Sequence, residues 1–373
     1  MLILERGVFV VNEPVKIVFC IPSLGSGGAE RVTSLLANQL VLKGYSVTVL
    51  MTARRHEVYP LSDMVQIACI NCDDDMDLSL VNRFLTRLKK IKKTIKNIAP
   101  DVVISFMSET NVDVCFALAG MNVPIIVSER NDPKTSPASR AKQIIRRLAY
   151  VMPRGFVFQT PDAQAYFSKR IQKKSKIILN PLSNSMPERF EGEREKRIVA
   201  VGRLHKQKNF SMLIDAFAEF SKTHPDRVLE IYGEGALEEK IREYINEKEL
   251  QDKVILKGFC KDLHERILCA EMFVMSSDFE GMPNALLEAM ALGLPCISTD
   301  CPCGGPRMLI ESYENGILVP VRDTKKMTEA MVYMADNSEK AEQMSINAVA
   351  VRDRANADAV TEQWLEMINL CKR

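Results

Sequence analysis

Two cations stand where a predicted strand gives way to a loop in the second half of the chain. Arg203 and Lys208 follow the apolar run at residues 198–201, in the stretch Gly-Arg-Leu-His-Lys-Gln-Lys. An arginine offers a planar fork of donors and a lysine offers a compact charge, so the pair suits a diphosphate. Taken alone, the two residues could equally be ordinary surface cations.

Two carboxylates follow at a spacing of eight residues. Glu280 and Glu288 bracket the segment Gly-Met-Pro-Asn-Ala-Leu-Leu. Pro283 is expected in the first turn of a helix, which places Glu280 in the preceding loop and Glu288 about one and a half turns inside the helix. Carboxylates in these places suit two groups of hydroxyls on one elongated ligand, although acids at random spacing are usually solvated.

A glycine-rich turn joins the first predicted strand to the first predicted helix. It reads Ser-Leu-Gly-Ser-Gly-Gly-Ala-Glu-Arg over residues 23–31, and such glycines let backbone N–H groups approach an anion closely. A dinucleotide fingerprint needs Gly-x-Gly-x-x-Gly, but the sixth position counted from Gly25 is Glu30. The turn is expected to bind an anion. Binding of NAD is a weaker alternative, and a plain tight turn without a ligand is another.

The elements that must position these motifs alternate between short β-branched runs and longer amphipathic ones. Strands are expected at residues 15–21, 45–51, 64–70, 101–106, 123–128 and 155–159, and a helix at 29–42. After a polar, proline-containing stretch, strands are expected again at 198–201, 229–232, 254–257, 272–275 and 295–298. This alternation favours crossovers and parallel sheets. We predict an α/β protein with two doubly wound domains, 1–185 and 186–355, a cleft between them, and a final helix within 356–373 that packs back toward the first domain.

Together the motifs resemble those of the family 4 glycosyltransferases, which have the GT-B fold. The resemblance covers nearly the whole chain and rests on segments 27–31, 202–208, 233–235 and 280–288. Segments 108–111 and 127–133 further resemble bacterial N-acetylgalactosaminyltransferases of surface-polysaccharide and N-glycan assembly. The resemblance implies two Rossmann-like domains, the first for the acceptor and the second for the nucleotide sugar. It also implies a retaining transfer of a hexose or N-acetylhexosamine, with a UDP-sugar as the expected donor.

The resemblance also implies roles for individual residues. Arg203 and Lys208 would hold the diphosphate and stabilise the leaving group. Glu280 would contact hydroxyls of the donor sugar, and Glu288 would bind the ribose. Further donor contacts are implied at Gly27, Gly28, Gly233, Gly235, Gly258, Phe259, Gly281, Met282, Pro283 and Asn284. The donor is a substrate, so neither a cofactor nor a metal ion is expected.

One position departs from the family pattern. Many members carry a histidine after the strand equivalent to residues 123–128, whereas this chain reads Ser128-Glu129-Arg130 there. An arginine stays protonated at working pH, so Arg130 is expected to bind a charge or a sugar hydroxyl. Glu109, Glu129 and Arg130 are predicted contacts of the acceptor or of the donor sugar.

Three further patterns bear on other kinds of chemistry: metal binding, thiol chemistry and hydrolysis. Asp75 and Asp77 form an Asp-x-Asp pair of the kind that binds a divalent metal in another glycosyltransferase fold, but no third ligand is evident and a solvated loop is favoured. The close cysteine pairs at 69–72 and 301–303 are unequally spaced, which favours thiols over a zinc or redox site. A Gly-x-Ser-x-Gly elbow, as in an α/β-hydrolase, is absent from the sequence.

Composition and charge limit the class of protein. The 373 residues are 46% hydrophobic and 26% charged, with ten cysteines, which is typical of a globular enzyme with reduced thiols in the cytoplasm. Neither a signal peptide nor a membrane-spanning run is evident. The net charge of +2 conceals +10 over residues 1–185 and −8 over 186–373, so the first half is expected to face an anionic partner.

Much of this positive charge falls in one amphipathic segment. Its apolar stripe, expected to pack on its own sheet, comprises Phe84, Leu85, Leu88, Ile91 and Ile95. The remaining surface is cationic, with no acid: Arg83, Arg87, Lys89, Lys90, Lys92, Lys93 and Lys96. This pattern favours an anionic membrane surface, with about 1 kcal/mol from each nearby cation, over a plain solvated helix. The same face is expected to extend to Arg140, Lys142, Arg146 and Arg147.

The sequence therefore predicts a metal-independent, retaining glycosyltransferase on the inner face of the cell membrane. Its expected partners are a nucleotide sugar, a polyprenyl-diphosphate-linked saccharide and an anionic membrane surface, and not nucleic acid. The alternatives are an NAD(P)-dependent oxidoreductase and a non-catalytic GT-B protein that only binds nucleotide or lipid. The presence of both Lys208 and Glu280 argues against the non-catalytic protein.

Overall fold

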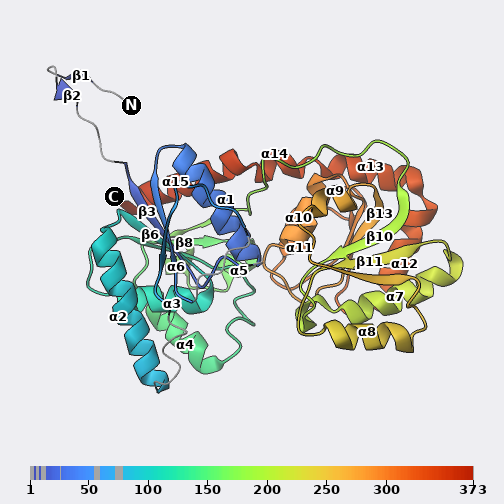
Figure 1. Cartoon of the computed structure of the whole chain (residues 1–373), viewed down its shortest axis with the longest axis horizontal. Helices are drawn as coiled ribbons and strands as arrows, with labels where there is room; N and C mark the ends of the chain where they lie inside the picture. The colour runs from blue at the N-terminus through green and yellow to red at the C-terminus, as the bar shows by residue number, and fades with distance from the viewer. Residues whose placement is uncertain are drawn as a thin grey trace.

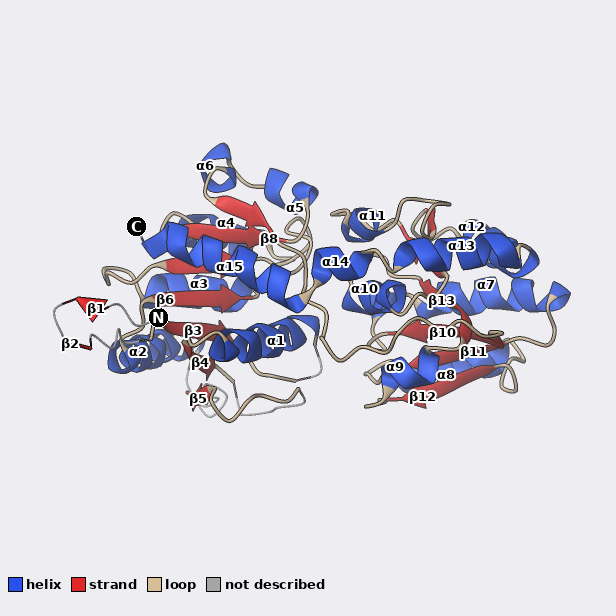
Figure 2. Cartoon of the chain, turned by 90° about the horizontal axis from the view of Figure 1, so that it is seen from above, coloured by secondary structure: helices blue, strands red, loops and turns tan. Residues whose placement is uncertain are grey.

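Two α/β domains lie side by side, each built around its own parallel sheet (Figures 1 and 2). The computed structural model describes residues 14–25, 27–53, 59–71 and 79–372, together with the backbone of two short strands, β1 (Leu4–Glu5) and β2 (Val8–Phe9), which pair with each other. Asp75, Asp77 and Cys72 lie outside the described residues, so their predicted roles stay untested.

The first domain contains a seven-stranded parallel sheet. Its strands are rich in valine and isoleucine, and the central ones are buried on both faces because helices cover both sides. In spatial order they are β5 (Gln66–Cys69), β4 (Ser46–Met51), β3 (Lys16–Ile21), β6 (Val102–Phe106), β7 (Ile125–Ser128), β8 (Gly155–Phe158) and β9 (Ser175–Ile177).

Helices cover this first sheet on both sides. One face packs against α1 (Gly28–Leu42) and the last helix of the chain, α15 (Ala357–Lys372). The other face packs against α2 (Leu80–Ile98), α3 (Ser108–Ala117) and α4 (Arg140–Ala149). The short helices α5 (Pro161–Ala165) and α6 (Lys169–Gln172) connect β8 to β9.

The second domain repeats this plan with six parallel strands. In spatial order they are β12 (Val254–Gly258), β11 (Val228–Tyr232), β10 (Glu195–Val201), β13 (Ala270–Met275), β14 (Cys296–Thr299) and β15 (Ile317–Val319). One core cluster joins the sheet to α7 (Phe210–Thr223), α8 (Glu238–Glu247) and α12 (Thr324–Asp336). A second joins it to α9 (Leu263–Ile267), α10 (Asn284–Ala291) and α14 (Val351–Ala355). The remaining helices are α11 (Gly305–Leu309), α13 (Ser338–Ala348) and the 3-10 turn η2 (Lys206–Lys208).

The predicted fold class is confirmed. Every expected strand is present, and its ends fall within three residues of the predicted ones. The short strands β1, β2, β9 and β15 were not predicted. Pro283 directly precedes α10 as its N-cap residue, so the helix begins one residue later than the sequence suggested.

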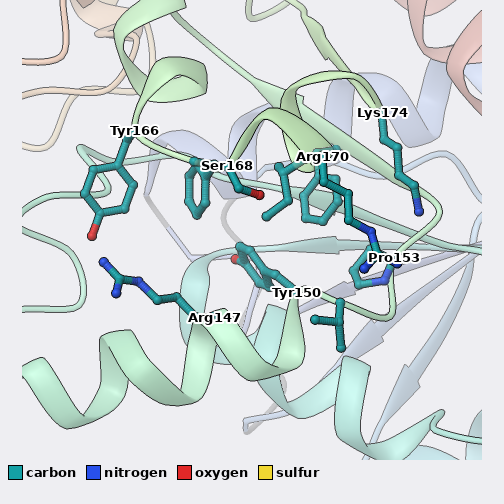
Figure 3. A pocket seen from close by; sticks show the side chains of 11 residues that line it. Arg147, Tyr150, Pro153, Tyr166, Ser168, Arg170 and Lys174 are labelled. Carbon is teal, nitrogen blue, oxygen red and sulfur yellow. The ribbon is translucent and has the colours of Figure 1, made fainter.

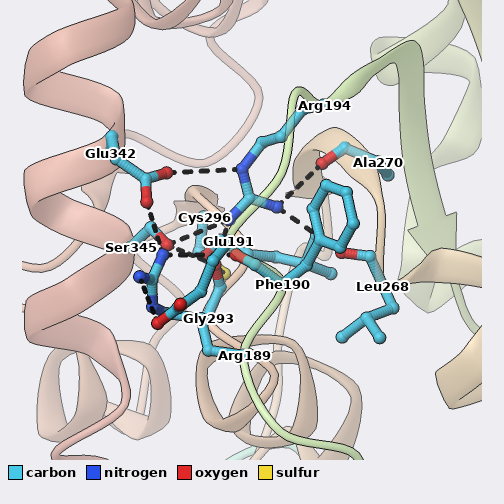
Figure 4. Close-up of polar contacts among 11 residues, drawn as sticks. Arg189, Phe190, Glu191, Arg194, Leu268, Ala270, Gly293, Cys296, Glu342 and Ser345 are labelled. Carbon is cyan, nitrogen blue, oxygen red and sulfur yellow. Dashed lines mark hydrogen bonds and ion pairs between the residues drawn. The ribbon is translucent and has the colours of Figure 1, made fainter.

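The polar segment that follows β9 is held firmly against the second domain (Figure 4). Arg189 binds Glu342 of α13. Arg194 donates hydrogen bonds to the backbone oxygen of Gly293 at 2.7 Å and to Ser345 Oγ at 3.0 Å. This segment therefore belongs structurally to the second domain and is not a free linker.

The end of the chain returns to the first domain (Figure 1). On α15, Val360, Trp364 and Ile368 are buried in the core that also contains α1 and β6. The Trp364 ring lies 5.8 Å from the ring of Phe106, centroid to centroid. Lys43 at the end of α1 adds an ion pair to Glu362 at 2.9 Å. The first domain is thus completed by the last residues of the chain.

Candidate active site

A cleft of about 740 Å³ separates the two domains. It lies beyond the carboxyl ends of β3 and β8 on one side and of β10, β11 and β12 on the other, the usual ligand position in open α/β sheets. Most of the predicted site residues line it: Gly27, Gly28, Arg130, Arg203, Lys208, Gly233, Phe259, Glu280, Gly281, Met282, Pro283, Asn284 and Glu288. Gly235, Gly258, Glu109 and Glu129 do not.

The glycine-rich turn meets the second domain directly. Gly28 begins α1, and its carbonyl oxygen accepts a hydrogen bond of 3.1 Å from Asn284 Nδ2 at the start of α10. A Cβ on Gly28 would lie 3.2 Å from the same nitrogen, which is tighter than most real contacts. The start of α1 and the start of α10 therefore converge at one point of the cleft, where the backbone N–H groups of helix N-termini favour anions.

Lys208 and Glu280 form an ion pair in the cleft wall. Lys208 ends the 3-10 turn η2, and its Nζ lies 2.6 Å from Glu280 Oε1. The same carboxylate oxygen accepts a hydrogen bond of 2.8 Å from Ser277 Oγ. Gly202 gives the lysine stem room, because a Cβ there would lie 2.8 Å from Lys208 Cε. The ammonium is thereby fixed in the wall of the cleft that Arg203, which is exposed, also lines.

Glu288 is bound from both domains. Its Oε2 lies 3.0 Å from His264 Nε2 in the second domain and 3.1 Å from an Arg31 nitrogen on α1. Neither partner was predicted from the sequence. The position of Arg31, directly after Gly-Gly-Ala-Glu in the predicted turn, was the signal that would have found it, whereas nothing in the sequence links His264 to Glu288.

Arg130 is buried at the edge of the cleft and has no carboxylate partner among the described residues. Its guanidinium lies over the Phe106 ring at 4.6 Å and donates a hydrogen bond of 2.7 Å to Asn180 Oδ1. Burial lowers the pKa of Arg130 to about 9. Asn180 in turn donates to Met282 O at 3.3 Å and to Asn284 Oδ1 at 2.5 Å. Arg130 therefore supports a hydrogen-bonded chain that joins the two domains.

Two predicted contacts of this region lie elsewhere. The Glu129 carboxylate is buried, accepts hydrogen bonds from the Tyr150 and Ser108 hydroxyls, and lies 3.6 Å from Arg146 Nη1. Burial raises the pKa of Glu129. Glu109 is exposed on α3 and pairs with a lysine of α4 at 2.5 Å. Glu129 thus serves the internal packing of the first domain.

Gly235 and Gly258 stand just behind the cleft wall. A Cβ on Gly235 would lie 2.5 Å from the Leu204 carbonyl oxygen, so this glycine allows two backbone segments to pack closely. Gly258 has a φ of +68°, a conformation that favours glycine, and immediately precedes Phe259, which does line the cleft. Both glycines therefore influence the site indirectly, because they allow the backbone conformation that positions the residues of the cleft wall.

The described residues hold no group of three side chains suited to a metal ion. Cys301 and Cys303 are buried as thiols, and burial raises their pKa values to about 12 and about 11. Thiols with such high pKa values are poor nucleophiles and poor metal ligands at neutral pH.

The basic surface of the first domain is partly as predicted. On α2, Ile91 and Ile95 are buried as expected, whereas Leu85 is 46% exposed, so its predicted packing on the sheet is wrong. Lys89, Lys92, Lys93 and Lys96 are exposed, with no acid partner among the described residues. Arg87 instead pairs with Asp113 at 2.9 Å. Among the described helices, none has both the length and the apolar character needed to cross a bilayer.

The predicted extension of this surface to Arg146 is wrong. Its side chain is 1% exposed and donates hydrogen bonds to the backbone oxygens of Pro133 and Ser136 at 2.8 and 2.6 Å. The sequence also gave no sign that apolar side chains of α4 would be exposed. Ile144 and Leu148 are 58% and 60% exposed.

Comparison with known proteins identifies the two domains. Residues 183–351 match the profile described as "Glycosyl transferases group 1", and residues 19–148 match "Glycosyltransferase family 28 N-terminal domain".

Two relatives come from Campylobacter jejuni. One, 26% identical over 95% of this chain and 98% of its own, is an alpha-1,4-N-acetyl-D-galactosaminyltransferase named for the acceptor GalNAc-alpha-(1->4)-GalNAc-alpha-(1->3)-diNAcBac-PP-undecaprenol. The other, 29% identical over 86% of this chain and 90% of its own, is an N-acetylgalactosamine-N,N'-diacetylbacillosaminyl-diphospho-undecaprenol 4-alpha-N-acetylgalactosaminyltransferase.

Solved structures agree with this fold. The Anabaena protein HepE in complex with UDP and glucose superimposes with a TM-score of 0.80 at 16% identity, over 95% of this chain and 99% of its own. The sucrose-phosphate synthase of Thermosynechococcus elongatus gives a TM-score of 0.81 at 17% identity, over 95% and 98% of the two chains. The chain is therefore a two-domain glycosyltransferase with the GT-B fold, and its second domain is of the group 1 type.

Proposed function

We propose that this glycosyltransferase is a retaining, metal-independent enzyme of family 4. It takes a hexose or N-acetylhexosamine from a UDP-sugar and transfers it to a saccharide carried on polyprenyl diphosphate, at the inner face of the bacterial cell membrane. The observation that carries the proposal is the composition of one cleft. Arg203 and Lys208 share a wall with Glu280 and Glu288, opposite the glycine-rich turn of the other domain.

The two cations suit the departing diphosphate. As the bond between sugar and phosphate breaks, negative charge develops on the diphosphate, and donors fixed beforehand stabilise it without reorganisation. Glu280 holds the Lys208 ammonium at 2.6 Å, so the charge is in place before the reaction begins. Arg203 adds a planar fork to the same wall.

The carboxylates suit the hydroxyls at the two ends of a nucleotide sugar. Glu280 lies beside the diphosphate cations, where the sugar would begin. Glu288 lies one and a half turns into α10, oriented by His264 and Arg31, and is assigned to the ribose. Since Arg31 belongs to the first domain, binding at Glu288 involves both domains.

Arg130 is assigned a positioning role in place of the histidine common in the family. Its carbonyl oxygen would lie 2.4 Å from a Cβ on Gly281, so the two backbones touch. Through Asn180 it also holds Met282 and Asn284. Arg130 thus helps to hold the loop before α10 in contact with the first domain.

The acceptor is inferred from the relatives and from the surface charge. Both Campylobacter jejuni relatives are named for saccharides on a diphosphate-linked undecaprenol. The exposed lysines of α2 and the exposed apolar residues of α4 lie on the same face of the first sheet, as a protein that takes its substrate from an anionic bilayer requires.

The donor can be identified by stabilisation. A nucleotide sugar at one hundred times its Kd raises the free energy of unfolding by about 2.7 kcal/mol, so a panel of UDP- and GDP-sugars should raise the unfolding temperature selectively. The best donor is then tested for transfer to polyprenyl-diphosphate saccharides, with the anomeric configuration of the product read by NMR. Stabilisation by GDP-sugars alone would refute the assignment of UDP, and an inverted product would refute retention.

Chelation tests metal independence. Transfer in excess EDTA is expected to keep its full rate, because Arg203 and Lys208 supply the charge that a divalent ion would otherwise bring to the diphosphate. The control is enzyme in excess magnesium, assayed with the same donor. Loss of transfer in EDTA that manganese or magnesium restores would contradict the prediction and return attention to Asp75 and Asp77.

Charge reversal tests the membrane surface on α2. Replacing Lys89, Lys92, Lys93 and Lys96 with glutamate should weaken binding to phosphatidylglycerol vesicles by at least 100-fold, since each cation near the surface contributes about 1 kcal/mol. Donor hydrolysis should be unchanged because none of these four lysines lines the donor cleft. Raising the salt concentration should likewise weaken the binding of the wild-type protein to these vesicles, because the Debye length shortens.

The matched control reverses four exposed lysines of the second domain, Lys240, Lys325, Lys326 and Lys340. Vesicle binding should survive in this variant. Equal losses in the two variants would show that the effect follows net charge alone and that α2 is an ordinary solvated helix.

A further inference from the structure

A second cavity lies on the outer side of the first domain, between α4 and α6 (Figure 3). Its volume of about 350 Å³ is within the range of small-ligand sites. The buried walls are aromatic and apolar: Tyr150, Pro153, Phe156 and Phe167. The exposed rim comprises Arg147, Val151, Ser168, Arg170 and Lys174. An apolar interior with a basic rim suits an amphiphile with an anionic head.

The three cations of the rim lack partners within the described part of the chain. Arg147 comes from α4 on one side, while Arg170 and Lys174 lie on the other, with Tyr150 between them (Figure 3). None of the three has an ion pair or a side-chain hydrogen bond to a described residue. Unpaired cations on both sides of one opening favour an anionic group such as a phosphate.

The outer face of α4 leads from the rim toward solvent. Arg140, Ile144, Arg147 and Leu148 recur at spacings of three and four residues, so they form one stripe along the helix, and Val151 follows two residues past its end. Ile144, Leu148 and Val151 are 58%, 60% and 58% exposed. Contiguous exposed apolar side chains flanked by cations are typical of a helix that lies in a membrane interface.

We propose that the basic rim of this cavity binds the phosphate of one anionic phospholipid, while part of an acyl chain occupies the apolar interior and the rest continues beside the apolar stripe of α4 into the bilayer. The inference deepens, and rests on, the membrane contact assigned under the proposed function. It differs from the general attraction of α2 in being a site for a single lipid molecule.

The place of the cavity excludes the reacting end of the acceptor. Phe156 lies near the start of β8, whereas Gln159, just past the end of the same strand, lines the donor cleft. The two openings are therefore at opposite ends of one strand. A lipid in the cavity would anchor the domain and orient the cleft relative to the bilayer, without taking part in the reaction.

Paired charge reversals separate a specific site from general attraction. Arg170→Glu with Lys174→Glu alters the rim. Lys169→Glu with Lys173→Glu makes the same change of charge one position earlier, at exposed residues that do not line the cavity. Affinity for nanodiscs that contain phosphatidylglycerol should fall at least tenfold further in the rim pair than in the control pair. Equal losses would overturn the proposal.

A change that leaves charge untouched gives the second test. Ser168 precedes α6 and makes no side-chain capping bond, so Ser168→Trp should block the cavity without loss of the fold, and Ser168→Ala should leave it open. The probe is dihexanoyl-phosphatidylglycerol below its micellar concentration, with binding measured by native mass spectrometry and folding by circular dichroism.

Binding to the wild type and to Ser168→Ala, but not to Ser168→Trp, is expected. No binding to the wild type, or equal binding to all three, would overturn the site. If glycerol phosphate binds the wild type as tightly as dihexanoyl-phosphatidylglycerol does, the site recognises only an anion, and the proposed lipid site would be overturned. Neither assay uses a donor or an acceptor, so failure of the lipid site is distinguishable from failure of the proposed transfer reaction.

Discussion

Replacement of Lys208 with alanine is expected to reduce kcat roughly 100- to 1000-fold while the protein stays folded. The leaving diphosphate loses a donor that is fixed before the reaction, and single preorganised donors of this kind contribute about 2.7–4 kcal/mol to the transition state. Because charge on the diphosphate grows as the bond breaks, kcat should fall more than KM rises. Single-turnover measurements with the identified donor and acceptor provide the test.

Lys206 provides the control for this prediction. It lies two residues earlier in the same 3-10 turn, is exposed, and does not line the cleft. Lys206→Ala should keep at least half of the wild-type kcat. A Lys208→Met variant keeps most of the apolar stem that packs on Gly202, so it separates loss of charge from loss of packing. If Lys208→Met turns over donor at nearly the wild-type rate, the assignment of this lysine to the diphosphate is wrong.

Replacement of Trp364 with alanine is expected to destabilise the first domain by about 3–5 kcal/mol, the usual cost of truncating a buried tryptophan. Its ring is 1% exposed, packs against Phe106, and lies 5.9 Å below the Arg130 guanidinium. This loss is a large part of the free energy of unfolding of a typical domain, which is about 5–15 kcal/mol. The free energy of unfolding is measured by urea unfolding followed by circular dichroism. Tryptophan fluorescence is unsuitable because the variant lacks the single tryptophan of the chain.

The matched variant is Leu370→Ala on the same helix. Leu370 is 57% exposed, so its truncation should change the free energy of unfolding by less than about 0.5 kcal/mol. The Trp364 variant should also expose the amides of β6 and β7 to hydrogen exchange while those of β13 stay protected. A loss below about 1 kcal/mol would mean that α15 is not an integral part of the first core.

The sheets were predictable because each strand carries its own local signal. A strand buried on both faces needs a short run of β-branched residues, and a helix that covers it needs apolar residues at helical spacing. Both patterns are readable from neighbouring residues alone. The sequence did not reveal β9 and β15, because the three residues in each, Ser175–Ile177 and Ile317–Val319, are too few to form a recognisable run.

Much of the candidate site was predictable for a related reason. Parallel strands bring their carboxyl ends to one edge of each sheet, so residues that follow different strands converge without any knowledge of distant contacts. Arg203 and Lys208 follow β10, Glu280 and Glu288 follow β13, and all four line one cleft. The spacing between Glu280 and Glu288 was enough to place one in a loop and the other in a helix.

By itself, the sequence determined the alternating elements, the two parallel sheets, and the edge at which the functional side chains gather. The tertiary structure alone decided which distant residues meet: Arg31 with Glu288, Arg130 with Phe106 and Asn180, and Trp364 with the first core. It also buried Arg146, which its sequence neighbours marked as a surface cation. The physical reason is that periodicity records only which face of an element is buried. A contact between segments far apart in the sequence depends on how elements with separate local signals are placed against one another, within one domain or between two.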